Sequence, residues 1–219
     1  MSTPHPARRN FLKSLAAMSF TAFLPLNLLP KTAEKPKLHF ISVGDLSAQV
    51  LTYLYETKPH SPAANLNAIY SCINDGQFEE YNQHKNIHLF DYENFNPANL
   101  LQHKRPCLLM TDLNDAQAAS IAADICKTQN LSGQKCTVIA FLPFLFEGTT
   151  TRQKAENQLI SLAQQAACHA IDLEKLRQEY GELPYNEAFQ VLNEKVERVL
   201  EEDLMGIGQN DSLVFIRAK

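Results

Sequence analysis

The stretch Lys135-Cys-Thr-Val-Ile-Ala-Phe141 is followed directly by Leu142-Pro-Phe-Leu-Phe-Glu-Gly148. The first of these two segments is almost continuously apolar, which is typical of a strand that is covered on both faces of a sheet. The proline and the glycine of the second segment end that strand in a loop. A strand covered on both faces needs helices on either side, so the stretch predicts an α/β domain with a mainly parallel sheet.

The segments on either side of this stretch alternate between short apolar runs and amphipathic helical patterns. The expected strands are residues 38–43, 66–72, 86–90, 106–111, 135–141 and 168–172, with a last one at 212–217. The expected helices are residues 46–55, 115–129, 152–167 and 184–205. This alternation predicts a single Rossmann-like domain of three layers, with the sheet in the middle.

The charge and the cysteine content of the sequence limit the classes of partner and the disulfides that can be expected. Residues 37–219 hold 15 Lys and Arg against 23 Asp and Glu, a formal charge of −8. No basic stripe is present, so nucleic acid is not expected as a partner. The five cysteines include no Cys-x-x-Cys pair and their number is odd, which argues against a disulfide framework. A single bridge stays compatible with an oxidising compartment.

A cationic segment precedes an apolar one near the N-terminus. Arg8-Arg-Asn-Phe-Leu-Lys13 is followed by the uncharged run 14–29, in the order of an export signal. The Arg-Arg-x-Phe-Leu-Lys form resembles the twin-arginine signal, whose translocon carries folded proteins. The residues of this signal are Arg8, Arg9, Phe11, Leu12 and Lys13. We therefore expect a signal and linker at 1–36 and a folded domain at 37–219.

This signal implies the twin-arginine translocon as a partner during export and a periplasmic or otherwise exported location. Pro25, Asn27 and Pro30 interrupt the apolar run, so contact with the membrane is expected to be transient. Two alternatives stay open. The best cleavage position follows Ala33 but has Lys31 where a small residue is usual, which leaves an uncleaved N-terminal tether. The other alternative is an ordinary basic and apolar N-terminus.

Several segments resemble FtsZ, the bacterial cell-division GTPase related to tubulin. The segment Phe141–Gly148 resembles the "PF-x-FEG" motif of that family. Further resemblances follow in order: 68–75 to "FIAVNTD", 155–156 to "AE", 171–176 to "IPNDKL" and 188–194 to "AFGAAND". The resemblance covers roughly residues 37–212 and implies the architecture of the FtsZ/tubulin N-terminal domain. It places Glu147 and Asn193 at positions of nucleotide contacts, with Arg152 one step from a family arginine.

The sequence departs from this family where GTP phosphates would bind. FtsZ uses glycine-rich loops after its first and fourth strands, because their backbone N–H groups must approach the phosphates closely. Here the first strand is followed by Gly44-Asp-Leu-Ser-Ala48 and the fourth by Asp112-Leu-Asn-Asp115, whose carboxylates would repel a triphosphate. Leu173 stands in place of a guanine-contacting Asn. Near Asn210-Asp211, a family loop that drives hydrolysis in filaments lacks its second acid.

These departures predict an exported, non-catalytic scaffold or protein-binding domain without GTPase activity, cofactor or metal. Its partner would be another protein or a second copy. The alternative is a cytoplasmic protein with residual GTP or GDP binding at Gly44, Glu147, Arg152 and Asn193. Glu147 and Asn193 are equally explained as a helix-start residue and a polar core contact. An enzyme with an unrelated site in the same crevice is a third hypothesis.

The export signal makes one direct prediction. Replacing both arginines, Arg8→Lys with Arg9→Lys, keeps the positive charge but removes the guanidinium pair, so the full chain should stay inside the cell. Fractionation of cells that produce the wild type and the variant measures this. Equal distribution of the two proteins would contradict twin-arginine export.

Overall fold

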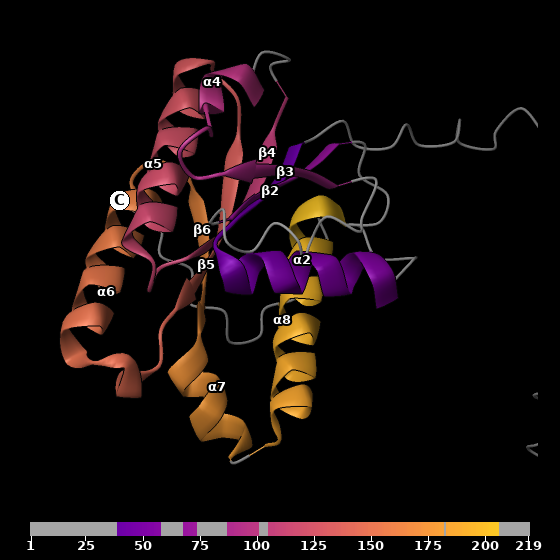
Figure 1. Ribbon diagram of the computed structural model, residues 1–219, viewed down its shortest axis with the longest axis vertical. Coiled ribbons are helices and arrows are strands. Elements are labelled where there is room, and N and C mark those ends of the chain that lie inside the picture. Colours follow the sequence, from indigo (N-terminus) through magenta and orange to yellow (C-terminus); the bar gives the residue numbers. More distant parts are fainter. Residues whose placement is uncertain (1–38, 58–67, 74–86, 101–104, 182, 206–219) are drawn as a thin grey trace, which may run out of the picture. The chain divides into compact units, whose positions relative to one another are not determined.

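A computed structural model of the chain describes residues 39–57, 68–73, 87–100, 105–181 and 183–205 (Figure 1). All of them belong to one compact unit, Lys35–Lys219. The expected signal at 1–36 and the expected strand at 212–217 lie outside the described residues, as does the boundary between the two predicted parts.

A six-stranded sheet forms the middle layer of the domain. Its strands are β1 (His39–Val43), β2 (Ala68–Ile73), β3 (Ile87–Asp91), β4 (Cys107–Asp112), β5 (Cys136–Leu142) and β6 (Ala167–Asp172). They lie in the order β3-β2-β1-β4-β5-β6, and every neighbouring pair is parallel. The predicted α/β class with a parallel sheet is confirmed.

Helices cover both faces of this sheet. They are α2 (Asp45–Thr57), α4 (Pro97–Leu100), α5 (Ala116–Leu131), α6 (Thr149–Ala163), α7 (Leu173–Tyr180) and α8 (Tyr185–Met205), with a short 3-10 turn η5 (Leu145–Glu147). Helices α2, α7 and α8 bury their apolar residues on one face, and α5 and α6 on the other (Figure 1). This is the predicted three-layer arrangement.

Side chains that alternate along each strand contribute to an apolar core on each face of the sheet. In β4, Leu109 points to the α5/α6 side, whereas Leu108 and Met110 point to the α2/α8 side. Strand β5 repeats the pattern with Val138 on one face and Ile139 on the other. All five side chains are at most 3% exposed. Because successive strand residues face opposite sides, a continuous apolar run is what a sheet between two helical layers needs.

Two helices differ from the sequence-based expectation. Helix α6 begins at Thr149 and ends at Ala163, about one turn earlier than predicted, because Gly148 at φ +110° ends the preceding turn and starts the helix. Helix α7 was not expected at all. It is eight residues long and mostly polar, and it begins where the Asp172 carboxylate accepts hydrogen bonds from the backbone N–H groups of Glu174 and Lys175.

The strand order reverses direction between β1 and β4. The chain moves outward from β1 through β2 to β3, and then outward again from β4 through β5 to β6. In doubly wound sheets, the crevice at the carboxyl ends of the strands beside such a reversal is the usual place for a ligand. The carboxyl ends of β1, β4, β5 and β6 are therefore the region in which to look for a site.

Candidate functional site

The turn between β1 and α2 holds the side chain of Asp112, the last residue of β4. Its carboxyl oxygens accept hydrogen bonds from the backbone N–H groups of Leu46 (2.7 Å) and Ser47 (2.9 Å), in the first turn of α2. Gly44 lies directly beneath it at φ +108°, and a Cβ there would lie 2.6 Å from Cγ of Asp112. Gly44 is thus required both for its backbone conformation and for the close approach of this carboxyl.

Asp112 is only 4% exposed. Burial raises the pKa of its carboxyl to about 7, and the neighbouring charge of Asp45 acts in the same direction. The hydrogen bonds from the backbone of Leu46 and Ser47 act in the opposite direction, because they favour the ionised form. The carboxyl therefore titrates near neutral pH while it occupies the N-terminus of α2.

A second carboxyl occupies the N-terminus of α5. Asp115 accepts hydrogen bonds from the backbone N–H groups of Gln117 (2.8 Å) and Ala118 (3.1 Å). Its other oxygen accepts one from the hydroxyl of Tyr92 (2.8 Å), whose pKa is raised by burial and by this bond. The two helix starts beside the reversal of strand order thus each hold an acid of the chain itself, at positions where fixed N–H groups favour an anion.

Glu147 links two loops at the same edge of the sheet. Its carboxylate accepts hydrogen bonds from the backbone N–H of Phe144 (2.9 Å), in its own turn, and from the side-chain amide of Asn114 (3.1 Å), in the loop after β4. The side chain is exposed. These bonds give Glu147 the helix-start role that the sequence offered as an alternative to nucleotide contact.

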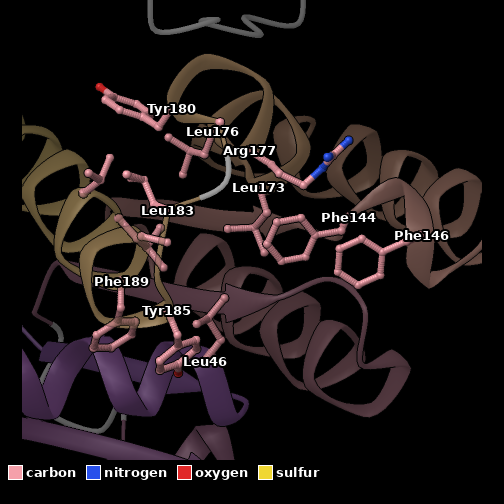
Figure 2. A pocket seen from close by; sticks show the side chains of 14 residues that line it. Leu46, Phe144, Phe146, Leu173, Leu176, Arg177, Tyr180, Leu183, Tyr185 and Phe189 are labelled. Atoms are coloured by element: carbon pink, nitrogen blue, oxygen red, sulfur yellow. The ribbon is translucent and has the colours of Figure 1, made fainter.

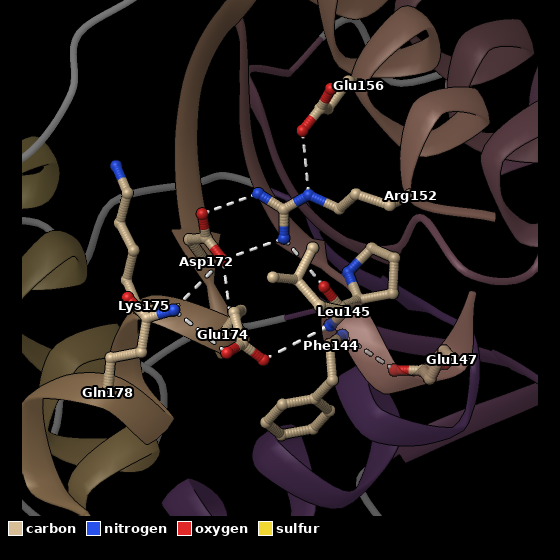
Figure 3. Close-up of polar contacts among 10 residues, drawn as sticks. Phe144, Leu145, Glu147, Arg152, Glu156, Asp172, Glu174, Lys175 and Gln178 are labelled. Carbon is tan, nitrogen blue, oxygen red and sulfur yellow. Dashed lines mark hydrogen bonds and ion pairs between the residues drawn. The ribbon is translucent and has the colours of Figure 1, made fainter. Parts of the chain in front are cut away.

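Arg152 lies in a network of internal contacts (Figure 3). Its guanidinium donates to both carboxylate oxygens of Asp172, at 2.8 and 2.6 Å, and to the carbonyl of Pro143 at 2.7 Å. Burial acts to raise the pKa of Asp172, but the Arg152 guanidinium holds it below its usual value. A bidentate pair of this kind fixes both partners. It joins α6 to the end of β6.

Asn193 lies on α8 and is 1% exposed. Its amide nitrogen donates to the carbonyl of Phe189 (2.7 Å), one turn earlier. Its buried Oδ1 has no hydrogen-bond partner within the described part of the chain. Among the described residues, no hydrogen bond or ion pair joins any two of Gly44, Glu147, Arg152 and Asn193. Their nucleotide role stays a prediction.

An apolar cavity of about 530 Å³ opens at this edge, between α7, α8 and the start of α2 (Figure 2). It is lined by Leu46, Phe144, Phe146, Leu173, Leu176, Arg177, Tyr180, Gly181, Leu183, Tyr185, Ala188, Phe189, Val191 and Leu192. The volume is in the ordinary range of ligand pockets, and such pockets are mainly apolar.

Aromatic rings dominate the mouth of the cavity. Phe144 and Phe146 are stacked, with ring centroids 4.8 Å apart, and Tyr185 and Phe189 are stacked at 6.0 Å. In Figure 2 the first pair follows β5 and the second lies on α8 near Leu46. Phe146 and Tyr185 are 75% and 71% exposed. The cavity is therefore a half-open crevice with solvent-facing rings.

No known protein family and no curated protein matches the sequence. Solved structures do match. FtsZ from M. jannaschii aligns with 90% of this chain, at 15% sequence identity and a TM-score of 0.61. CetZ from Methanosaeta thermophila aligns with 80% of the chain, at 16% identity and a TM-score of 0.61. CetZ2 from Haloferax volcanii, in a GTPγS-bound protofilament, aligns with 76% of the chain, at 16% identity and a TM-score of 0.52.

The chain has an FtsZ/tubulin-like fold. It spans 59%, 56% and 58% of the lengths of these three neighbours, respectively. The architecture that the sequence resemblance implied is confirmed, since the same fold is found without reference to the motifs.

Three further observations concern metal sites, membrane-spanning helices and disulfides in this FtsZ/tubulin-like domain. In residues 39–57, 68–73, 87–100, 105–181 and 183–205, no group of three His, Cys, Asp or Glu side chains could hold a metal ion. No helix in those ranges is long and apolar enough to span a bilayer. The thiols of Cys107, Cys126, Cys136 and Cys168 are buried and form no disulfide.

Asp112 and Asp115 were recognised in the sequence as acids that would repel a phosphate, but not as helix caps. The partners of Asp112 lie 65 and 66 residues away and give no local signal. Those of Asp115 are two and three residues ahead, so its position at the start of a predicted helix was a signal for its cap. The aromatic cavity was missed as well. A signal for it was present in two aromatic pairs, Phe144 with Phe146 and Tyr185 with Phe189, each beside a predicted loop.

The contact between Gly44 and Asp112 predicts a strong effect of a small substitution. Gly44→Ala should lower the free energy of unfolding by at least about 3 kcal/mol, because positive φ and overlap with the carboxyl both oppose the methyl group. Gly133→Ala is the matched control, since Gly133 also has positive φ but open space around it. It should cost about 1 kcal/mol. Urea denaturation measures both, and equal losses would contradict the contact.

The pKa of Asp112 predicts a pH dependence of stability. An aspartate in the unfolded chain titrates near 3.9, so the native state binds this proton more tightly and gains stability as the pH falls from about 7 to about 4. As the pH falls through that window, the free energy of unfolding of the wild type should rise relative to that of Asp112→Asn. The difference should grow by up to about 1.4 kcal/mol per pH unit.

Urea denaturation across this pH range measures the difference. Asp124→Asn, on the exposed side of α5, controls for the loss of a carboxylate and should keep the pH profile of the wild type. If Asp112→Asn keeps that profile too, Asp112 does not titrate near neutral pH.

Proposed function

We propose that this FtsZ/tubulin-like domain is an exported, non-catalytic protein-binding domain that has lost the phosphate-binding function of its loops. The observation that carries the proposal is the carboxyl of Asp112 on the first turn of α2. A phosphate at that helix start would have to displace a buried acid that is already hydrogen-bonded to the N–H groups it needs.

The second helix start supports the same function. Asp115 already accepts the hydrogen bonds of the first turn of α5 and is held there by Tyr92. In the FtsZ family the loop at this position is rich in glycine, which leaves N–H groups open to the phosphates. Because both helix starts are occupied by acids of the chain, a triphosphate would have to displace both carboxyls to reach these N–H groups.

The polar groups that resemble nucleotide contacts are engaged elsewhere. Glu147 accepts two hydrogen bonds within the loops, and Arg152 is paired with Asp172 in bidentate geometry. Moving Arg152 onto a ligand would leave the partly buried carboxylate of Asp172 without its cation, which costs free energy. Glu147 is exposed, so its release from the loops would cost less. The domain is then a scaffold whose binding surface lies elsewhere.

Export is part of this proposal. The pair Arg8-Arg9 and the apolar run after it support delivery of a folded domain to a space where GTP is not expected. Self-association is a further way for such a scaffold to act, since neighbours of this fold are described as an FtsZ dimer and a CetZ2 protofilament.

Residual nucleotide binding in the cytoplasm is the second candidate. One observation favours it, namely that Oδ1 of the buried Asn193 lacks a hydrogen-bond partner within the described residues. Such an atom is unusual in a folded protein and is a place where a ligand donor could bind. Asn193 alone supplies no contact for a phosphate, so this candidate needs Asp112 or Asp115 to move.

Nucleotide assays on the purified full chain separate the two candidates. We expect no heat of binding with millimolar GTP or GDP, with or without Mg²⁺, and no release of phosphate from GTP. Calorimetry and a phosphate-release assay measure these quantities. Turnover of GTP would overturn the non-catalytic proposal, and binding that Asn193→Ala abolishes would establish the second candidate.

A further inference from the structure

We propose that the aromatic cavity between α7 and α8 is the docking site for a cationic amphipathic segment of a partner protein. The inference rests on the proposed function, because it names the partner class of the binding domain. It places apolar side chains of the partner in the cavity and basic side chains of the partner on its rim.

Exposed apolar side chains gather at the cavity. The described residues contain six large hydrophobic side chains that are exposed, and four of them lie in or beside the cavity mouth: Leu145, Phe146, Tyr180 and Tyr185. Their gathering at one crevice marks an interaction surface, whereas scattered exposed residues would not. Phenylalanine and tyrosine are also enriched at protein–protein interfaces, and tyrosine in the residues that dominate their affinity.

The solvent-accessible charges beside the cavity are mainly acidic. Three acids are each next to a lining residue: Asp45 beside Leu46, Glu147 beside Phe146 and Glu187 beside Ala188. Two lysines are also near: Lys175 is next to Leu176, and Lys195, which is paired with Glu179, lies 5.4 Å from the ring centroid of Tyr180. Arg177 is the one cation among the described lining residues, and its guanidinium is ion-paired with Glu174 at 2.6 Å. That pairing lowers the pKa of Glu174 to about 2.

The charge at the rim of the cavity distinguishes among its possible ligands. A second copy in a symmetric contact would bring one acidic rim against another, and an anionic membrane surface would be repelled. An uncharged hydrocarbon ligand would make no use of the rim and would leave the solvent-facing rings of Phe146 and Tyr185 uncovered. A segment with an apolar face and basic flanks uses both features and gains electrostatic steering.

The test uses the full chain and a synthetic peptide of about five helical turns, with leucine on one face and lysine on the other. A second peptide has glutamate in place of every lysine. Fluorescence anisotropy of the labelled peptides reports binding. We expect the lysine peptide to bind, with an affinity that falls as salt is added, and the glutamate peptide not to bind.

Matched variants separate docking from general attraction to an acidic protein. Phe146→Asp should weaken binding of the lysine peptide by at least about tenfold, because it removes an anchor, although it adds negative charge. Leu131→Asp adds the same charge at a side chain that is 82% exposed on α5, outside the cavity, and should not weaken binding. Glu187→Gln should weaken binding about threefold at low salt and less at high salt.

Tighter binding to both aspartate variants would show simple charge attraction and would overturn the inference. Binding of the uncharged dye N-phenyl-1-naphthylamine in the cavity, with no binding of the lysine peptide, would assign the cavity to a small apolar ligand instead. The nucleotide assays are scored separately. GTP turnover with intact peptide docking would refute the non-catalytic proposal alone, whereas loss of peptide docking with no GTP binding would refute the docking site alone.

Discussion

The carboxyl of Asp112 on the N-terminus of α2 is the interaction on which the rest of the site depends. It joins the end of β4 to the start of α2, on the two strands where the order of the sheet reverses. It also determines the residue beneath it, because no side chain fits at Gly44. An acid that the chain supplies to itself does not need to be captured, and it cannot diffuse away. This helix start is therefore occupied by a carboxyl of the chain itself in every folded molecule, whether that carboxyl is protonated or ionised.

This constraint divides the carboxyl edge of the sheet into two regions. The inner region, at β1 and β4, is polar and closed by Asp112 and Asp115, each hydrogen-bonded to a helix start. The outer region, between α7, α8 and the start of α2, is apolar and open, and it adjoins the inner region at Leu46. Arg152 lies between them and holds α6 to the end of β6 through Asp172. The rigid contacts of the inner region thus support an outer crevice that is free to bind something else.

The sequence predicted the sheet and both cores well, because buried strands such as β4 and β5 show their apolar runs locally. It did not predict α7, because a segment of eight mostly polar residues is too short for its apolar positions to show a helical repeat. It identified the acid at 112 but not its partners, because a cap that acts across 65 residues leaves no local pattern. The cap at Asp115 is local, and the position of this acid at the start of a helical pattern was its signal. The cavity needed the packing of four separate segments, so its two aromatic pairs were visible in the sequence but could not be placed at one site.

The close approach of Asp112 to Gly44 has a consequence for recognising related domains from their sequences. A side chain at 44 would overlap the carboxyl of Asp112, so the acid at 112 requires glycine at 44. The identity of position 44 therefore depends on a residue that is far from it in the chain. A related protein with the same contact should have Gly and Asp at the corresponding positions, even where its overall sequence identity to this chain is low. That pair of residues would mark the domains of this fold in which a carboxyl of the chain itself occupies this helix start.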